Sequence, residues 1–376
     1  MKKHFLILFL LVILLKCSYF LFYKVCFENI EEVKKTEVVQ RSFIGIFNKS
    51  DAGWYERIAT KGYPKITDKK DIGYSSGIEC RQSEWAFFPV YPLLLKGVMF
   101  AFNIDFNHAA FITSLLFTYL CFISFYFLNL FLFKRTETQA FYNTLFFILF
   151  PFNYYYSMYY TEALFFSLIA LCFIAIYKNK LWLLSVLLIP LSLTRPNGLA
   201  ILLPLYLFFL ETNRKEGFKI NAPLIKRSLF FVTGPLGFAL YCLYQKSMTN
   251  EYFAFSLAQA GWYREFMFPL LSLFRRGDYA TQFNSVYIII FMLISIFSFK
   301  KFPLSLNVLI WVCILLPLCS GSVLSIQRYI SIIFPLMVMF GNYFQLFRIR
   351  NWLLIGVLIF HFGSFYFWVI SSQLSF

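Results

Sequence analysis

Long apolar runs recur along the whole chain, and they constrain the fold more than any other feature. Stretches of 18 or more residues with few charges return between short polar segments, and this is the length that a helix needs to cross a bilayer. Of the 376 residues, 60% are hydrophobic and only 14% are charged, whereas soluble domains carry about 25% charged residues. The unbroken runs argue against a β-barrel, whose strands alternate over short segments. The sequence therefore predicts an all-α, polytopic helical membrane bundle that forms a single domain over residues 1–376.

The formal net charge of +16 is distributed unevenly between the apolar runs. Short clusters hold 15 cations with three acids nearby: Lys2/Lys3, Lys134/Arg135, Lys178/Lys180, five cations in Arg214–Arg227, Lys300/Lys301 and Arg348/Arg350. Segment 28–84, in contrast, has ten residues of each sign, and segment 247–283 has three of each. Because excess Lys and Arg mark cytoplasmic loops, the net charge indicates orientation, and no nucleic-acid partner is expected.

Placing every basic cluster in the cytoplasm requires an even number of crossings between clusters, which predicts eleven spans with the amino terminus inside. Residues 1–27 are then an uncleaved first span, because the apolar stretch lacks a small-residue cleavage site. Segment 85–104 contains Pro89, Pro92 and Lys96, so a re-entrant or interfacial helix is expected there. The predicted spans are 4–27, 108–133, 138–158, 161–177, 181–194, 197–211, 228–246, 284–299, 302–321, 324–345 and 352–371.

Residues 181–210 are nearly all apolar and fit either one tilted helix or two short ones. Two short helices are favoured, because they keep the cluster Arg214–Arg227 in the cytoplasm. Each would have about 14 residues and a length of about 21 Å, against a hydrocarbon core of about 30 Å. The turn Thr194–Gly198 between them should therefore lie below the outer surface, where a charge requires an enclosed or wet cavity.

This topology brings several polar residues to one outer face: Asp51, Glu162, Arg195 and the stretch Gln327–Tyr329. Ionisable residues inside a membrane are costly and are candidates for function. The structural alternative is an ion pair such as Glu162–Arg195.

The catalytic candidate lies in the first external loop, residues 28–107. Trp54, Tyr55, Ile58 and Ala59 form one apolar stripe at helical spacing, which predicts an interfacial helix with Trp54 and Tyr55 at headgroup depth. Ser50 or Asp51 would cap that helix and Gly62 would end it. Capping is one role for Asp51. The other is to accept a proton from a hydroxyl while Arg195 and Arg328 hold a phosphate.

The order of motifs resembles a known family. Ser50-Asp51-Ala52-Gly53-Trp54-Tyr55, Ile58-Ala59, Gly62-Tyr63 and Ala86–Pro92 are similar to the first luminal loop of the GPI mannosyltransferase 2 (PIG-V) family. The turns Tyr159–Phe165 and Thr194–Gly198 and the stretch Gln327-Arg328-Tyr329 resemble its later motifs, so the resemblance covers most of the chain. One departure is Ser50, because the family usually has Trp before this aspartate.

The resemblance implies a GT-C-type membrane glycosyltransferase, which takes a sugar from a polyprenyl- or dolichyl-phosphate donor and attaches it with inversion to a lipid or glycan acceptor. The site would face the periplasm of a bacterial inner membrane or the lumen of the endoplasmic reticulum. Asp51 is then the expected catalytic base. The candidate substrate-binding residues are Trp54, Tyr55, Glu162, Arg195, Asn197, Arg328 and Tyr329.

No cofactor and no metal site are expected. The three histidines, at positions 4, 108 and 361, are scattered, and no acidic pair is spaced for a divalent cation. Seven of the eight cysteines lie in apolar spans; Cys80 lies in a loop, where both a free thiol and a bond to Cys26 are open.

Two other classes of membrane protein are alternatives to a glycosyltransferase. A lipid-linked-sugar flippase or secondary transporter would also need arginines in a cavity, but the internal repeat typical of transporters is not found. An O-antigen ligase or polymerase places its large loop late in the chain. The single large external loop of this chain, with its interfacial helix and its aspartate, favours an enzyme, whereas the second external loop 247–283 is explained most simply by membrane anchoring through Trp262 and Tyr263.

Overall fold

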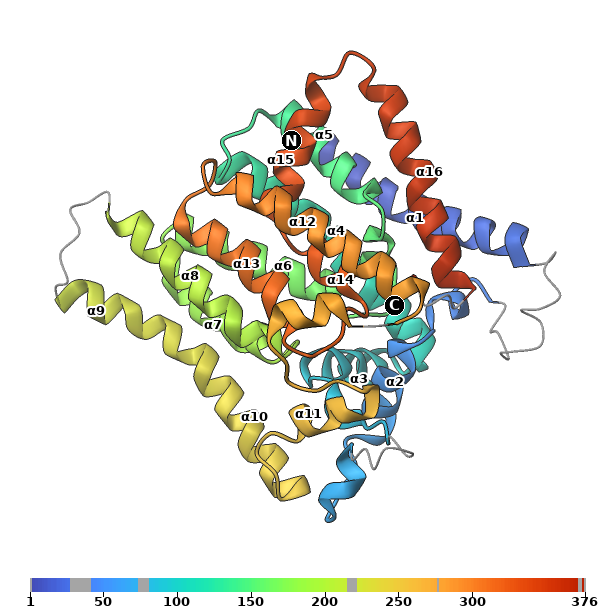
Figure 1. Cartoon of the computed structure of the whole chain (residues 1–376), viewed down its shortest axis with the longest axis vertical. Coiled ribbons are helices and arrows are strands. Elements are labelled where there is room, and N and C mark those ends of the chain that lie inside the picture. The colour runs from blue at the N-terminus through green and yellow to red at the C-terminus, as the bar shows by residue number, and fades with distance from the viewer. Residues whose placement is uncertain are drawn as a thin grey trace.

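The computed structural model describes residues 2–27, 42–73, 81–214, 222–275, 277–370 and 374. Within these ranges the regular elements are α-helices and short 3-10 helices (Figure 1). Five helices are long and apolar enough to cross a membrane: Lys2–Cys26, Phe106–Phe131, Ala222–Thr249, Tyr279–Ser298 and Arg350–Val369. The prediction of an all-α membrane protein is thus confirmed at this level. Cys80 lies outside the described residues.

These long helices account for the first and last spans and for three between them. They are α1 (Lys2–Phe27), α4 (Phe106–Phe131), α12 (Tyr279–Ser298), α16 (Arg350–Val369) and the continuous segment of α9 (Ala222–Ser228), η6 (Leu229–Val232) and α10 (Thr233–Thr249).

Shorter helices of 12 to 18 residues occupy the remaining expected spans: α5 (Glu137–Leu149), α6 (Glu162–Tyr177), α7 (Leu181–Ser192), α8 (Asn197–Arg214), α13 (Leu304–Leu318) and α15 (Phe334–Leu346). At 1.5 Å per residue they are about 18–27 Å long, which is less than the hydrocarbon core of about 30 Å. Each expected span therefore contains a helix, and five of these helices reach full length.

Two of the expected spans are not continuous helices. α5 ends at Leu149, because Pro151 disfavours the helical conformation for the residue before it, Phe150. The 3-10 helix η5 (Asn153–Ser157) follows. The span expected at 324–345 is divided into α14 (Ile326–Ser331) and α15, with Pro335 in the first turn of α15. The continuous helices predicted at 138–158 and 324–345 are therefore wrong at their outer ends.

Helix α6 lies at the centre of the bundle (Figure 1). Its sequence is apolar on all sides, and a helix of this kind is buried all round. Thirteen of its sixteen residues are buried, and α4, α7 and α8 pack against it. Phe166 of α6 packs on Phe147, which in turn stacks on Phe125 with ring centroids 4.3 Å apart. The burial of α6 brings its first residue, Glu162, inside the protein.

The break between α7 and α8 confirms the prediction of two short helices over 181–210. α7 ends two residues after Pro190, and α8 begins directly after Pro196. The two helix ends approach so closely that a Cβ atom on Gly198 would lie 2.0 Å from the carbonyl oxygen of Leu191. Only glycine fits at this position, and the contact holds the turn with Arg195 against the end of α7.

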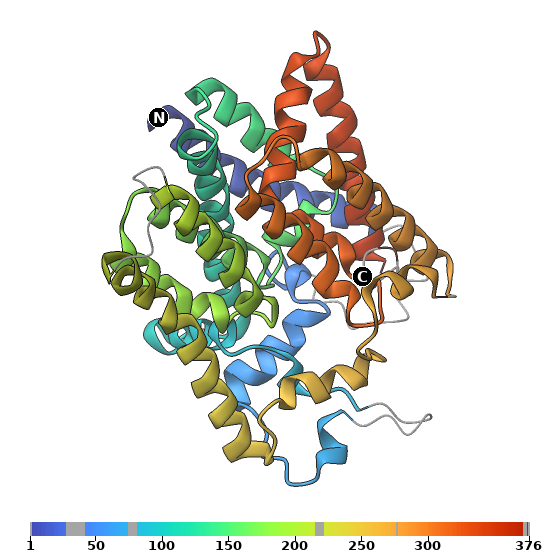
Figure 2. The ribbon, with the colours of Figure 1, turned by 60° about the vertical axis from the view of Figure 1, so that its left-hand side comes forward.

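The two loops that the sequence predicts outside the membrane pack on each other at one end of the bundle (Figure 2). The first contains η2 (Gly45–Phe47), α2 (Asp51–Lys61), η3 (Lys69–Ile72), η4 (Glu84–Ala86) and α3 (Val90–Phe102). The second contains α11 (Ala254–Leu257), η7 (Ala258–Trp262) and η8 (Pro269–Phe274). A hydrophobic cluster joins both loops to α10: Ile72, Trp85, Phe88, Tyr241, Ala254 and Ala258. We call this assembly of the two loops the external layer.

We expect Gly198→Ala to destabilise the protein, because the new Cβ atom would displace the carbonyl group of Leu191. Overpacking of this kind costs about 1–3 kcal/mol, which thermal unfolding of the purified protein in detergent would measure. Gly356→Ala in α16 is the matched control, because nothing lies within 4 Å of its Cβ position. Equal stability of both variants would contradict the close packing of α7 on α8.

Candidate functional site

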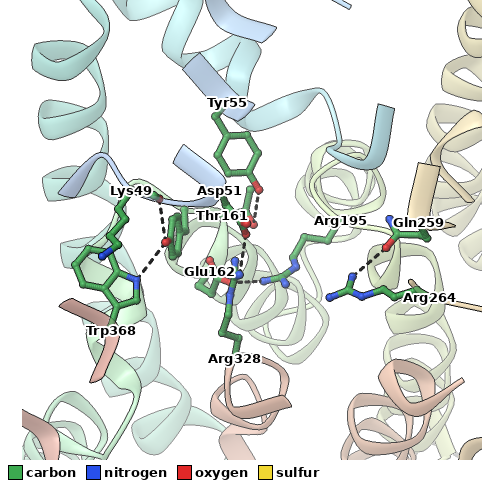
Figure 3. Close-up of polar contacts among 11 residues, drawn as sticks. Lys49, Asp51, Tyr55, Thr161, Glu162, Arg195, Gln259, Arg264, Arg328 and Trp368 are labelled. Atoms are coloured by element: carbon green, nitrogen blue, oxygen red, sulfur yellow. Dashed lines mark hydrogen bonds and ion pairs between the residues drawn. The ribbon is translucent and has the colours of Figure 1, made fainter. Parts of the chain in front are cut away.

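Four charged side chains from distant parts of the chain meet beside the external layer (Figure 3). They are Asp51 at the start of α2, Glu162 at the start of α6, Arg195 in the α7–α8 turn and Arg328 in α14. The sequence predicted that these residues reach the same outer face, and the structure brings them into direct contact. We call them the charged cluster.

Glu162 is the centre of the charged cluster. Its Oε1 atom accepts hydrogen bonds from Arg195 Nη1 at 2.7 Å and from Arg328 Nε at 2.5 Å. Arg328 extends further, because its Nη1 atom lies 2.7 Å from Asp51 Oδ2. One guanidinium group thus connects the two carboxylates, and the ion pair Glu162–Arg195, which was the structural alternative, is present within this larger network.

Burial separates the two carboxylates. The side chain of Glu162 is fully buried, and those of Arg195 and Arg328 are only 10% and 7% exposed. The side chain of Asp51 is 26% exposed, so it is the member of the cluster that a hydroxyl group reaches most easily. A buried ion pair requires its partners strictly, because a single buried charge without a countercharge is strongly destabilising. Glu162 is therefore needed to neutralise the buried arginines, whereas Asp51 is not.

Aromatic rings surround the two arginines. The Arg328 guanidinium lies 4.8 Å from the ring centroid of Tyr160 and 5.4 Å from that of Tyr155, and the Arg195 guanidinium lies 5.1 Å from that of Tyr329. The negative face of an aromatic ring attracts a cation. These contacts hold both guanidinium planes without neutralising their charge.

Hydrogen bonds fix the segment just before Asp51 in place (Figure 3). Tyr160 donates its hydroxyl hydrogen to the carbonyl oxygen of Lys49 at 3.0 Å, and Trp368 Nε1 donates to the Tyr160 hydroxyl at 3.2 Å. Lys49 Nζ in turn donates to the carbonyl oxygen of Val369 at 2.7 Å. The start of α2 is thereby attached to the outer end of α16.

The backbone at Ser50 is strained. Its φ of 54° and ψ of −116° belong to the first central position of a type II′ turn, which glycine normally occupies, and Ala52 N–H closes the turn on the Lys49 carbonyl at 3.2 Å. Such conformations persist where the surroundings impose them, often at functional sites. Ser50 holds the N-cap position of α2, while the Asp51 carboxylate contacts Arg328. The structural alternative, a capping Asp51, is therefore not what the structure shows.

Tyr55 faces the interior rather than the headgroups. Its hydroxyl lies 3.5 Å from Thr161 Oγ1, and its ring packs edge-on against Phe87 and Tyr91. Burial raises the pKa of the Tyr55 phenol, and the carboxylates of Asp51 and Glu162 raise it further, so the hydroxyl group stays protonated. Tyr55 is thus covered by α3 and its neighbours and is not exposed on the surface of α2, while the depth of this helix in the membrane stays a prediction.

Two further predicted residues lie outside the charged cluster. Trp54 stacks on Phe87 and packs edge-on against Trp262 of the second external loop. Asn197 is the first residue of α8, and among the described residues it makes no hydrogen bond with the four charged side chains. Trp54 thus belongs to the contact between the two loops, and Asn197 to the start of a helix.

Arg264 is a site residue that the sequence did not reveal. It lies in the second external loop, where Figure 3 shows its guanidinium group pointing toward Arg195. Arg264 Nη1 donates to Gln259 Oε1 at 2.9 Å, its Nε atom is buried without a partner, and no described carboxylate lies within 4.0 Å of it. It is also close enough to Tyr329 to act on it electrostatically. In sequence it resembles any arginine of a charge-balanced loop, so no local signal marked it.

Arg264 changes the net charge of the site. Two carboxylates and two arginines make the charged cluster neutral overall. Arg264 adds one positive charge beside it. These five side chains carry a net charge of +1, a sign that suits a singly negative group such as a phosphodiester.

No known protein family matches the sequence, and no curated protein matches it significantly. Among the residues that the structure describes, no group of three His, Cys, Asp or Glu side chains is placed to hold a metal ion. A reaction without metal or cofactor stays a prediction.

We expect Glu162→Gln and Asp51→Asn to differ strongly in their effect on stability, although both replace a carboxylate by an amide of the same shape. Glu162→Gln leaves two buried arginines short of a countercharge and should cost about 3–5 kcal/mol. Asp51→Asn leaves Arg328 paired with Glu162 and should cost less than about 1 kcal/mol. Thermal unfolding of both variants in the same detergent measures the difference, and similar losses would contradict the central role of Glu162.

Proposed function

We propose that this protein is a mannosyltransferase-like membrane glycosyltransferase. It transfers a sugar from a polyprenyl- or dolichyl-phosphate donor to a hydroxyl group of a lipid-linked or surface acceptor, with inversion. The observation that carries the proposal is a partly exposed carboxylate beside arginines that could bind phosphate. Asp51 lies 2.7 Å from the buried Arg328, and the nearby Arg264 has no described carboxylate partner. The resemblance to the PIG-V family supports the same conclusion.

The reaction in this proposal is a single displacement at the anomeric carbon of the sugar. The acceptor oxygen forms the new bond from the face opposite the phosphate, and the bond between the anomeric carbon and the phosphate oxygen breaks with its electron pair. Asp51 accepts the proton of the acceptor hydroxyl, and the lipid phosphate leaves as the anion. Inversion requires the acceptor oxygen and the departing phosphate to lie on opposite faces of the sugar, so in this proposal Asp51 serves the acceptor face and the arginines serve the phosphate face.

Arg328 and Arg264 have different roles in this proposed reaction. Arg328 is paired with both carboxylates, so it orients Asp51 and contributes to the binding of phosphate through the remaining donors of its guanidinium group. Arg264 has no carboxylate partner among the described residues and supplies the charge that the donor phosphate needs. Arg195 with Tyr329 lies between them and completes the binding surface.

The proposal includes eleven crossings with the charged cluster on the periplasmic or luminal side. The basic pairs Lys134/Arg135 and Lys178/Lys180 follow the ends of α4 and α6. Glu162 and Asp105, in contrast, lie at the beginnings of α6 and α4. The two ends of the same helices thus carry opposite signs, and the positive ends are expected in the cytoplasm.

We expect Asp51→Asn to slow transfer strongly without unfolding the protein. Purified protein is incubated with polyprenyl-phosphate mannose and candidate acceptors, and product formation is measured. A general base contributes about 10²–10⁴-fold to the rate, so kcat should fall by that factor. Asp71→Asn is the control, because Asp71 is an exposed acid of the same loop that pairs with Arg81.

Normal turnover by Asp51→Asn would overturn the assignment of the base. If neither protein transfers sugar from any lipid-phosphate donor, while liposomes that contain it translocate lipid-linked sugars, the flippase or transporter is the correct class.

We expect Arg264→Gln to weaken the binding of the donor more than it slows the chemical step. A hydrogen bond to a charged group is worth about 1.5–3 kcal/mol, so KM for the lipid-phosphate donor should rise by about 10–100-fold while kcat changes little. Arg81→Gln, an exposed arginine of the external layer, should leave KM unchanged. A loss of kcat at unchanged KM would contradict a role in binding the donor.

A further inference from the structure

A cavity of about 730 Å³ lies at the end of the bundle opposite the charged cluster. α4 begins at Phe106, beside the external layer, and ends about 39 Å further along its axis, four residues before Arg135. The cavity is open on one side and is lined by the first turns of α5, the end of α15, the beginning of α16 and the α12–α13 turn. Its volume lies in the range typical of sites for small ligands.

The lining of this cavity carries one sign of charge. Arg135, Lys301 and Arg350 belong to it, and no acidic side chain does. These cations occupy three separate segments of the chain, so the tertiary structure brings them together. The charge pattern of the sequence accounts for each of them as a cytoplasmic residue, but it does not account for a shared cavity.

The three cations have no countercharge among the described residues, because no described carboxylate lies within 4.0 Å of any of them. Lys301 Nζ donates to the Tyr343 hydroxyl and lies 4.4 Å from the centroid of that ring. The Arg350 guanidinium lies 4.7 Å from the ring centroid of Tyr142. Arg135 Nε is buried without a hydrogen-bond partner. Aromatic rings and hydroxyls orient these cations but leave the positive charge available to an anion.

An apolar rim adjoins the cavity. Leu346 lines it and is 77% exposed, and Phe347, Ile349 and Trp352 follow with exposures of 54%, 56% and 73%. Trp is typical of the level at which the headgroups of a bilayer meet its acyl chains. The cavity therefore offers a cationic chamber and an apolar surface side by side.

We propose that this cavity binds the phosphate headgroup of an acidic phospholipid, with its acyl chains along the rim Leu346–Trp352. A phospholipid headgroup and a free phosphate both carry the phosphate group that these three cations would bind. The lipid is favoured because a free phosphate would leave the apolar rim uncovered. The site lies away from Asp51 and does not depend on the proposed transfer reaction.

Native mass spectrometry of the full chain, purified in a neutral detergent, tests the proposal. The protein is titrated with phosphatidylglycerol, with phosphatidylcholine of the same acyl chains, and with inorganic pyrophosphate. We expect one copy of phosphatidylglycerol to bind more tightly than further copies, and phosphatidylcholine not to replace it. The double variant Arg135→Gln/Arg350→Gln should weaken this copy by about 30-fold, since each basic residue near a membrane surface contributes a factor of about five.

Two further variants distinguish the site from a general effect of charge. Lys178→Gln/Lys180→Gln removes the same charge from exposed positions at the same end of the bundle and should leave binding unchanged. Arg135→Lys/Arg350→Lys keeps the charge and should retain most of the affinity. Equal losses in both Gln double variants would overturn the site, as would the absence of a tighter first copy. Displacement of the lipid by pyrophosphate at equal concentration would overturn the assignment to a lipid in favour of a soluble phosphate.

Discussion

The buried carboxylate of Glu162 is the group on which the outer end of the bundle depends. It neutralises Arg195 from the middle of the chain and Arg328 from its last quarter. Without Glu162, Arg195 would be buried with no described carboxylate beside it, and Arg328 would keep only Asp51. The start of α6, the α7–α8 turn and α14 must therefore pack around one carboxylate, and this packing forms the floor of the site.

The external layer is attached to this floor through Asp51. Arg328 contacts Asp51 on one side and Glu162 on the other, and Tyr160 holds the backbone of Lys49. The strained turn at Ser50 is maintained by these contacts from several helices. The two carboxylates therefore differ in exposure. Glu162 is fully buried beneath the external layer, whereas Asp51, at the edge of this layer, is partly exposed.

Much of the site could be predicted from sequence, because its parts carry local signals. Pro190, Pro196 and Gly198 predict the break between α7 and α8, and the apolar stripe with Gly62 predicts α2. The even number of crossings required between basic clusters predicts that four charged residues lie on one face. The side of α2 that Tyr55 faces depends on packing against α3, which no local signal shows. Pro151 and Pro335, in contrast, mark the end of α5 and the start of α15 locally, and the predicted spans ran through both.

The sequence by itself determined the membrane class, the helical architecture and the distribution of charge between the two ends, since apolar length and Lys/Arg counts act locally along the chain. Only the tertiary structure decided which charges are neutralised. Arg195 and Arg328 share Glu162, whereas Arg264 in the external layer and Arg135, Lys301 and Arg350 at the opposite end have no described carboxylate beside them. The reason is physical: pairing depends on distances of a few ångströms between segments far apart in sequence, and no local pattern encodes them.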